Sequence, residues 1–483
     1  MSIKSISTNI GKALLINALF MFIAIIISVI DGLDPAFTPL VISFLVTTIT
    51  GTFPFIFVKK SQPVTLQSGF LTIVLSWLLS IIFGMLPYIL WGGEFTIANA
   101  WFESVSGYTT TGSTILTDIE ALPRSLLFWR SSTHFIGGLG VIVFLLMIIP
   151  DSSGAKLRLT HLELSSLSKE GYRYKSRTIS RVMVSVYIGL AILETLLLWA
   201  AGMTPFDAVN HAFSTVSTGG FSTKNASIMY FDCVAIEIII TVFMALSAMN
   251  FGVIFAVIAK RSMKPLQHPV TRYYFGMMAA LSIIIALTLK IQGGYGSWGK
   301  AILDSTFQTV SYISTTGFRQ AENALWPVLV NTILLFGALH GGCAGSTTGG
   351  IKADRMYIAL SAIKGEFRKR LHPSSLVRTK VGNRIISDGT VSSVFLYIVL
   401  YLLVIAASFA LAVICGIDVS EAFSGTLATL GNVGPATGTI GTMGNYSALP
   451  SAAKFVFTIN MFIGRLEIFP VLIVISMIFK REK

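Results

Sequence analysis

Charged residues are scarce in this chain, and their scarcity limits what it can be. Only 12% of its 483 residues are charged, whereas 53% are hydrophobic, and the mean hydropathy is +0.76. Soluble domains carry about 25% charged residues, so this composition excludes a soluble globular fold. The chain is expected in a lipid bilayer.

Cysteines and catalytic motifs are also few. Cys233, Cys343 and Cys415 lie in or beside apolar runs without metal-ligand spacing, so no disulfide framework is expected. The chain contains no P-loop lysine motif, GxSxG or HExxH, and no nucleophile–base pair stands out. We therefore expect neither an enzyme nor a chain that binds a nucleotide itself.

Long apolar runs dominate the remainder. A helix needs about 20 apolar residues to cross a bilayer. Candidate runs are about 10–30, 37–58, 67–91, 126–149, 179–201, 233–259, 273–291, 326–340 running on into 341–350, 391–415 and 453–479. The first run starts near Lys12 and lacks a small-residue cleavage site, so we interpret it as a retained anchor.

Basic residues are distributed unevenly between the connecting segments. The chain has 35 Lys and Arg against 22 Asp and Glu, a net charge of +13. Most of the basic residues fall at the termini, at Lys59 and Lys60, and within 156–181, 260–272 and 352–384. The positive-inside rule places these segments and both termini in the cytoplasm. Alternatively, the basic loops also dock an acidic partner or anionic lipid.

One short pattern occurs four times. In each copy an apolar segment leads into a Gly-rich stretch with Thr or Asn. The stretches are Thr109-Thr110-Thr111-Gly112-Ser113, Ser217-Thr218-Gly219-Gly220-Phe221, Ser314-Thr315-Thr316-Gly317-Phe318 and Leu430-Gly431-Asn432-Val433-Gly434-Pro435. A polar or acidic residue stands thirteen positions before the last glycine of each, namely Asn99, Asp207, Asp304 and Glu421.

These polar residues predict the starts of four short helices, over about 99–110, 207–217, 304–314 and 421–430. A side-chain oxygen at such a position can cap the exposed N–H groups of a helix. Alternatively, Asp207, Asp304 and Glu421 coordinate incoming cations at the outer mouth of a pore. Segments this short do not cross a bilayer, so re-entrant helices are expected.

The pattern divides the chain into an accessory part and four repeats. The final glycines are separated by 108, 97 and 117 residues, which indicates internal repetition. We expect an all-α polytopic membrane protein with a two-helix hairpin over 1–62. Each predicted repeat consists of a span, a short helix, a loop and a second span. The four repeats are 63–155, 156–265, 266–380 and 381–483.

The third repeat departs from the others within its second span. Ten residues there include five glycines, which makes a poor helix. The stretch is Gly341, Gly342, Cys343, Ala344, Gly345, Ser346, Thr347, Thr348, Gly349 and Gly350, followed by Ile351 and Lys352. Non-helical backbone at membrane depth is tolerated only against protein or a water-filled cavity. We expect this stretch to line a pore.

Backbone carbonyls suit the task of carrying a cation across a membrane. They replace the ion's water without fixed charge, and a glycine permits the backbone turn that aims them at one axis. The short helices would point their negative C-terminal ends at the same centre. The expected ligands are the carbonyls of Thr110, Thr111, Gly112, Thr218, Gly219, Gly220, Thr315, Thr316, Gly317, Asn432, Val433 and Gly434.

These motifs together resemble the Trk/Ktr/HKT superfamily of potassium transporters, and within it the TrkH type. The similarity covers nearly the whole chain and rests on TTTGS, STGGFST, STTGFR, GNVGPATG, GGCAGSTTGGIK and GRLEIFP. It implies four M1–P–M2 units around one pseudo-fourfold pore, K⁺ as the transported ion, and the loop 341–352 as a gate. It also implies a homodimer in the bacterial cytoplasmic membrane, regulated by a cytoplasmic RCK-type nucleotide-binding ring (TrkA-like).

The resemblance also bears on selectivity. In related plant proteins a serine at the first filter glycine accompanies sodium transport, and this chain has Gly112 there. Potassium is therefore the expected ion. Each loop has one matched glycine where a potassium channel has two, which argues against very high discrimination of K⁺ from Na⁺.

Arg465 lies within the last apolar run, where a charge is costly and usually faces a cavity or a partner. We expect it beside the permeation path near the loop 341–352, opposing a resident cation, as the family also implies. The alternative is a salt bridge with Glu467 or another acid. Residues two apart on a helix do not face each other, which disfavours Glu467.

Other assignments remain open at this level. His134, His211 and His340 are expected to be hydrogen-bonded packing residues, not proton relays. Transport coupled to Na⁺ or H⁺ is an alternative to simple conduction, with Arg465 and His340 as the candidate coupling residues. A secondary transporter for an organic solute is less compatible with four matched loops.

Overall fold

The computed structural model describes residues 3–57, 66–147, 176–292, 294–374, 377–441 and 444–480. Within these ranges the backbone is almost entirely helical, and the β structure is a short antiparallel pairing of β1 (Lys380–Val381) with β2 (Arg384–Ile385). The all-α polytopic fold is thus confirmed. Lys59, Lys60, most of the basic segment 156–181 and the boundaries between 62 and 63 and between 155 and 156 lie outside the described residues.

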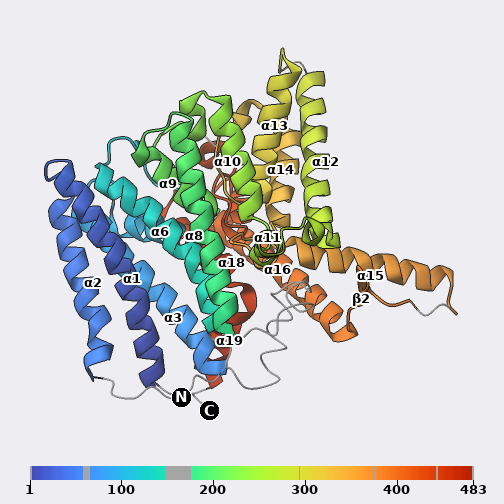
Figure 1. The fold of residues 1–483 in the computed structure, drawn as a ribbon, viewed down its shortest axis with the longest axis horizontal. Coiled ribbons are helices and arrows are strands. Elements are labelled where there is room, and N and C mark those ends of the chain that lie inside the picture. Colours follow the sequence, from blue (N-terminus) through green and yellow to red (C-terminus); the bar gives the residue numbers. More distant parts are fainter. Residues whose placement is uncertain are drawn as a thin grey trace.

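The first two helices form a hairpin at one side of the molecule. α1 (Ile3–Ile30) and α2 (Phe37–Phe57) lie along each other, and α1 also packs on later helices (Figure 1). They approach closely where Gly11 faces Gly51, since a Cβ on Gly11 would stand 2.6 Å from the Gly51 carbonyl oxygen. Small residues permit such close packing of membrane helices.

The remaining helices follow a recurring order of long helix, short helix and second helix. The first set is α3 (Leu66–Gly84), α4 (Leu86–Trp91), α5 (Ile97–Tyr108) and α6 (Arg124–Met147). The second is α8 (Ser176–Ala200), α9 (Pro205–Val216), α10 (Val234–Ser247) and α11 (Phe251–Lys260). The third is α12 (Pro269–Ile291), α13 (Trp298–Ile313), α14 (Val328–His340) and α15 (Ala353–Leu371). The fourth is α16 (Asp388–Ile414), α17 (Val419–Leu430), α18 (Ser451–Leu466) and α19 (Ile468–Lys480).

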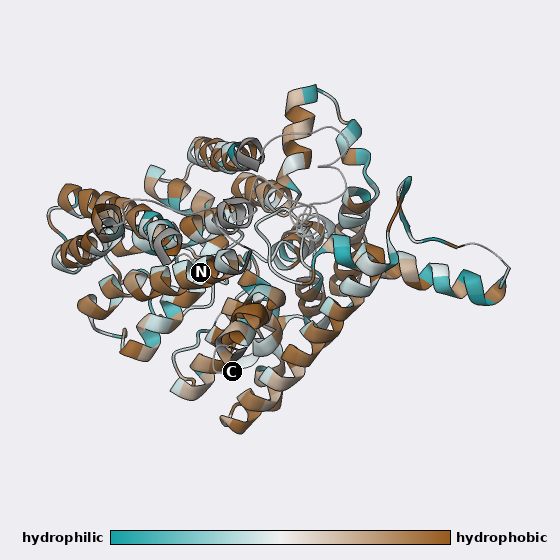
Figure 2. Cartoon of the chain, turned by 90° about the horizontal axis from the view of Figure 1, so that it is seen from below, coloured by the Kyte–Doolittle hydropathy of each residue, from teal (hydrophilic) through white to brown (hydrophobic). Residues whose placement is uncertain are grey.

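Several helices are suited to a bilayer by length and composition. Among the described residues six helices are long and apolar enough to span, or up to eight spans if two bent pairs are included. Most of the helical segments are hydrophobic along much of their length (Figure 2). Exposed examples such as Ile30 (77%) and Ile291 (80%) would be costly in water and are ordinary in lipid.

Two apolar runs that the sequence presents as continuous are broken. The run 233–259 folds as α10 and α11, bent by 101°, and the run 453–479 folds as α18 and α19, bent by 106°. The breaks fall at Asn250, whose side chain caps α11, and at Glu467, which has a left-handed φ of 61°. Together with the interruption between α14 and α15, three of the four second helices are broken.

The four short helices begin earlier than predicted. Their N-terminal caps are Thr96, Thr204, Ser297 and Asp418. The capping role predicted for Asn99, Asp207, Asp304 and Glu421 is therefore wrong. Three of these residues are the third residue of their helix, and Asp304 is the seventh of α13, because α13 starts a turn earlier than its counterparts.

The three acidic residues instead bind the chain that returns after each loop. Asp207 accepts from the Thr223 hydroxyl at 2.6 Å, Asp304 from the Gln320 amide at 2.9 Å, and Glu421 from the Thr439 backbone N–H at 2.6 Å. In the first unit, Asn99 accepts from the Lys454 ammonium at 2.7 Å. The bonds of the three acidic residues fix α9, α13 and α17 to the chain after their own loops, whereas the Asn99 bond joins α5 to α18.

The chain ends and the α12–α13 connection lie on opposite sides of the molecule. α1 begins and α19 ends on one side, whereas α12 ends and α13 begins on the opposite side (Figure 1). α15 projects away from the helical body and carries Arg368, Lys369 and Arg370 in its last turn (Figure 1).

Gly84 provides a test of this packing. A Cβ there would collide with the buried ring of Tyr108, the last residue of α5, whereas Gly189 in α8 has no atom within 4 Å of its Cβ position. We expect Gly84→Ala to destabilise the protein by about 1–3 kcal/mol through overpacking. Gly189→Ala should be neutral or stabilising, because alanine favours a helix over glycine.

Thermal melting of both variants in detergent, followed by loss of the monodisperse peak, measures this difference. Equal melting temperatures for Gly84→Ala and Gly189→Ala would show that α3 and α5 do not pack as described.

Candidate ion pathway

Each short helix ends in the same hydrogen-bonded turn. In the first, the Thr110 N–H donates to Gly107 O at 3.0 Å and the Thr111 N–H to Ser106 O at 2.9 Å, which is a Schellman motif. The corresponding pairs are Thr218–Thr215 and Gly219–Ser214, Thr315–Tyr312 and Thr316–Ser311, and Asn432–Thr429 and Val433–Ala428. The four loops therefore leave their helices in one geometry.

Two residues in every loop adopt a left-handed backbone. The first is a non-glycine, with φ between 52° and 57°, at Thr110, Thr218, Thr315 and Asn432. Such a conformation costs a non-glycine residue about 1–2 kcal/mol. The second, two positions later, is the matched glycine, with φ of 82°, 81°, 76° and 97° at Gly112, Gly220, Gly317 and Gly434. The same strain at one position of all four loops indicates a common constraint.

The four glycines meet in a closed ring. A Cβ added to any of them would strike the carbonyl oxygen that precedes the glycine of the next loop. The pairs are Gly112 with Gly219, Gly220 with Thr316, Gly317 with Val433, and Gly434 with Thr111. The last pair returns to the first loop, so the loops surround one centre.

The ring carries buried carbonyls without donors. The residues involved are buried, and their oxygens accept no hydrogen bond from any described residue. They are the carbonyls of Thr110, Thr111, Thr218, Gly219, Thr315, Thr316, Asn432 and Val433. Buried carbonyls nearly always have partners. A ring of free oxygens therefore suits a cation that has lost its water.

An ion pair that the sequence analysis missed supports the first two loops. Glu103 of α5 and Arg130 of α6 are almost fully buried, and Arg130 Nε donates to Glu103 at 2.6 Å. Glu103 also accepts the Ile115 N–H at 3.0 Å, just after the first loop. Arg130 donates to Ser222 O at 3.2 Å and lies 3.7 Å from the Phe221 ring, just after the second loop. The sequence did contain a signal for this pair, because Arg130 is a charged residue inside the apolar run 126–149.

The glycine-rich stretch between α14 and α15 packs against this ring. Gly341, Gly342, Cys343, Ala344, Gly345, Ser346, Thr347, Thr348, Gly349 and Gly350 are all non-helical, as expected from their composition. The Thr218 hydroxyl donates to Thr347 O at 3.0 Å, and the Gly349 N–H donates to the Thr315 hydroxyl at 3.0 Å. The stretch thus contacts the strained residues of the second and third loops.

The helix breaks hold this stretch in place. Asn250, at the α10–α11 break, donates to Ala344 O at 2.6 Å. Glu467, at the α18–α19 break, binds Arg355 at 2.6 Å and Lys352 at 3.2 Å, where the stretch ends. Breaks in the second and fourth units therefore anchor the interruption in the third.

Arg465 reaches the same stretch from α18. Its side chain is buried, and its guanidinium donates to Thr347 O and, at 3.3 Å, to Gly137 O of α6. Its partners are carbonyls, while Glu467 pairs with Lys352 and Arg355. Arg465 and Glu467 thus form no ion pair among the described residues, although Glu467 lies at the break after α18 and not on the same helix, as the sequence argument had assumed.

The three histidines lie in packed surroundings. His211 bonds Asp207 O at 2.7 Å and the Ser222 hydroxyl at 2.9 Å, and His340 bonds Gly341 O at 2.8 Å and the Tyr273 hydroxyl at 2.9 Å. The His134 ring stacks on Phe221 at 3.9 Å, and its nitrogens have no partner among the described residues. The hydrogen bonds predicted for His134 are therefore absent there.

Known proteins share this sequence and architecture. The model of the TrkH family, described as a cation transport protein, matches residues 38–483. The "Trk system potassium uptake protein TrkH" of Escherichia coli K12 is 35% identical over 389 residues, 80% of each chain. That of Vibrio parahaemolyticus is 34% identical over 391 residues, again 80% of each. The crystal structure of the potassium transporter TrkH from Vibrio parahaemolyticus superposes with a TM-score of 0.89 at 32% identity and covers 98% of both chains.

The Glu103–Arg130 pair provides a test of how the loops are supported. Glu103→Gln leaves the Arg130 charge buried without its counter-ion, which costs about 3–5 kcal/mol. We expect a clearly lower melting temperature in detergent, and a double Glu103→Gln/Arg130→Gln variant that loses less than the sum of the single changes.

Arg124→Gln is the matched control, because Arg124 is 55% exposed and bonds Asp31 at 3.1 Å on the surface. If Glu103→Gln and Arg124→Gln had the same melting temperature, the buried pair would not be supporting the loops.

Proposed function

Because the chain belongs to the TrkH family of cation transport proteins, we propose that it takes up potassium through the ring of loop carbonyls. It is a transport protein and not an enzyme, since the related proteins are named for potassium transport. The observation that carries the proposal is the closed ring of buried carbonyls that accept no hydrogen bond within the described part of the chain.

The ring acts as a selectivity filter. The carbonyls of eleven of the twelve residues predicted from the sequence replace the hydration shell of K⁺ without fixed charge, so that the ion can also leave. The twelfth, Gly434 O, instead accepts hydrogen bonds from the Ser113 hydroxyl at 3.1 Å and the Tyr446 hydroxyl at 2.9 Å. The C-terminal ends of α5, α9, α13 and α17 lead into the loops, and their partial negative charge favours a cation there. An inward-negative potential drives entry, at about 2.3 kcal/mol per charge per 100 mV.

The stretch 341–352 acts as a gate below the filter. It blocks the path while Thr347 and Gly349 are bonded to the second and third loops. The Arg465 charge repels a cation beside it, and movement of the stretch away from the ring would open the path. Through the contacts of Asn250 and Glu467, the second and fourth units restrain this movement.

We extend the proposal to topology and assembly. Each of the predicted repeats 63–155, 156–265, 266–380 and 381–483 supplies one wall of the pore, and 1–62 is accessory. The protein works as a homodimer in the bacterial cytoplasmic membrane, with both termini in the cytoplasm. An RCK-type ring docks from that side, and the basic last turn of α15, which projects laterally from the helical body (Figure 1), provides a contact for it.

Purified protein in liposomes tests the function directly. Rb⁺ should enter down its electrochemical gradient, and K⁺ should compete. A rate that does not change when a Na⁺ or H⁺ gradient is imposed supports simple conduction, whereas a dependence on either gradient indicates symport. Absence of Rb⁺ entry at any gradient would refute the proposal.

Gly112→Ser should weaken discrimination between Rb⁺ and Na⁺. The new Cβ would displace the Gly219 carbonyl and strain a backbone with φ of 82°. We expect the Na⁺/Rb⁺ flux ratio to rise roughly tenfold, equivalent to about 1.4 kcal/mol. Gly189→Ser, whose Cβ meets open space, should keep the wild-type ratio. An unchanged ratio in Gly112→Ser would remove the first loop from the filter.

Arg465→Ala should raise Rb⁺ flux severalfold at equal protein, because it removes both the repelling charge and a bond that holds Thr347. Arg465→Lys keeps the charge and should stay near wild type. Unchanged or reduced uptake by Arg465→Ala liposomes would exclude a gating role for this side chain.

A further inference from the structure

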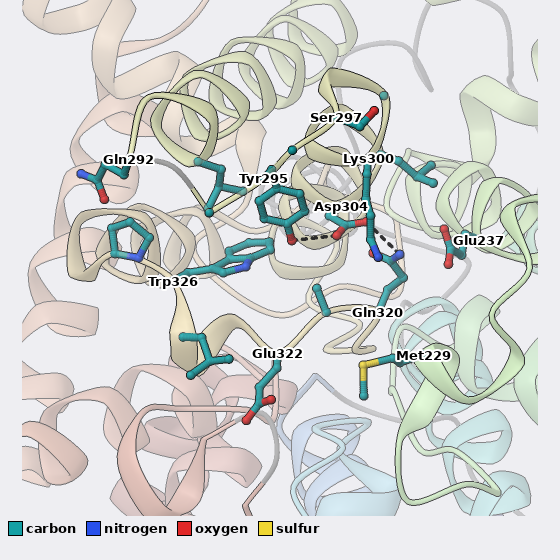
Figure 3. A pocket seen from close by; sticks show the side chains of 18 of the residues that line it. Met229, Glu237, Gln292, Tyr295, Ser297, Lys300, Asp304, Gln320, Glu322 and Trp326 are labelled. Atoms are coloured by element: carbon teal, nitrogen blue, oxygen red, sulfur yellow. Dashed lines mark hydrogen bonds between the residues drawn. The ribbon is translucent and has the colours of Figure 1, made fainter.

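A large cavity lies on the side of the molecule where α12 ends and α13 begins. It has a volume of about 1260 Å³ and lies among the first residues of α10, α13 and α14 and the connections before them (Figure 3). Here it is called the lateral cavity. Its volume is above the range of 300–1,000 Å³ that is typical of small-molecule sites.

The charged residues in the walls of the lateral cavity are mostly acidic. Asp232, Glu237, Asp304 and Glu322 line it, against the single lysine Lys300. An excess of carboxylates attracts cations, but charge alone does not define a site. No cluster of metal-ligating side chains suited to a metal ion occurs among the described residues.

Two buried polar atoms in this wall lack partners. Glu237 and Gln320 are 6% and 7% exposed, and neither Glu237 Oε2 nor Gln320 Oε1 has a hydrogen-bond partner in the described part of the chain. Leaving such an acceptor unsatisfied costs about 1–3 kcal/mol. The Gln320 amide orientation is set by its bond to Asp304, so Oε1 remains available as an acceptor. Both atoms can accept a hydrogen bond from a ligand, and they lie together because the Glu237 and Gln320 side chains adjoin.

Aromatic rings stand on the other side of Asp304. The Tyr295 hydroxyl donates to Asp304 at 2.7 Å, and its ring meets that of Trp326 edge-on, with centroids 6.4 Å apart (Figure 3). Burial and the adjacent Asp304 carboxylate raise the pKa of Tyr295 well above its usual value, so that it remains a donor. Aromatic faces beside carboxylates favour an ammonium on a carbon skeleton.

We propose that the lateral cavity binds the ammonium group of an organic cation. Glu237 and Gln320 accept its N–H groups, and Tyr295 and Trp326 pack against its carbon chain. The ammonium comes either from a soluble polyamine or from the ethanolamine headgroup of a phospholipid. The site is close to the third loop, because Gln320 lies three residues after Gly317 and bonds Asp304 of α13. The proposal is independent of potassium conduction.

Calorimetric titration of the full-length protein in a non-ionic detergent, with spermidine as the probe at constant ionic strength, tests the soluble source. We expect saturable binding that Glu237→Gln weakens at least tenfold. Glu120→Gln, which removes a carboxylate from a separate outer connection, should bind as wild type. Trp326→Leu should also weaken binding and serves as a second variant if Glu237→Gln does not fold.

Native mass spectrometry tests the lipid source. Protein reconstituted in phosphatidylglycerol with phosphatidylethanolamine should retain phosphatidylethanolamine, and Glu237→Gln should lose it. Loss in either assay that is specific to Glu237→Gln or Trp326→Leu supports the site and identifies its source. Equal binding by wild type and both variants in both assays, or equal loss in Glu120→Gln, would overturn the proposal.

Discussion

The structure depends on the mutual contact of four loops whose buried carbonyl oxygens accept no hydrogen bond from the described residues. Each matched glycine lies directly against the carbonyl that precedes the next, so a side chain at any of the four would open the ring. Because these oxygens are buried, the loops are stable only if the oxygens bind a partner such as a cation. A cation on the axis satisfies this requirement, and the surrounding helices are arranged to keep the loops in position.

The backbone of the ring is nearly fourfold, but its support is not. Nine residues before each glycine stand Glu103, His211, Gln308 and Gly425. Glu103 bonds Arg130, His211 bonds the Ser222 hydroxyl, Gln308 reaches Ala321 O at 3.4 Å, and Gly425 packs against Ile440 and Phe457. The first two units are thus tied together by charge and the fourth by packing. The interrupted helix of the third unit lies against this unequal frame.

The sequence predicted the features that depend on local chemistry. The spacing of Gly112, Gly220, Gly317 and Gly434 located all four loops, and glycine content located the interruption after His340. The helix starts were misplaced, because a hydroxyl three residues earlier competes successfully as the cap, as Thr96 and Thr204 do. Breaks at Asn250 and Glu467 were missed because apolar residues dominate both runs, although Asn250 itself and Pro470 were available as helix-interrupting signals. Pairings such as Glu103 with Arg130 are set by tertiary packing and leave no periodic pattern.

Anomalous diffraction from crystals of the protein soaked in Rb⁺ tests the central claim most directly, because it locates the ion without reference to transport. The account predicts a peak on the axis between the four loops, within coordination distance of the carbonyls of Thr111, Gly219, Thr316 and Val433. Rb⁺ bound elsewhere in the membrane region, with no peak inside the ring, would contradict it.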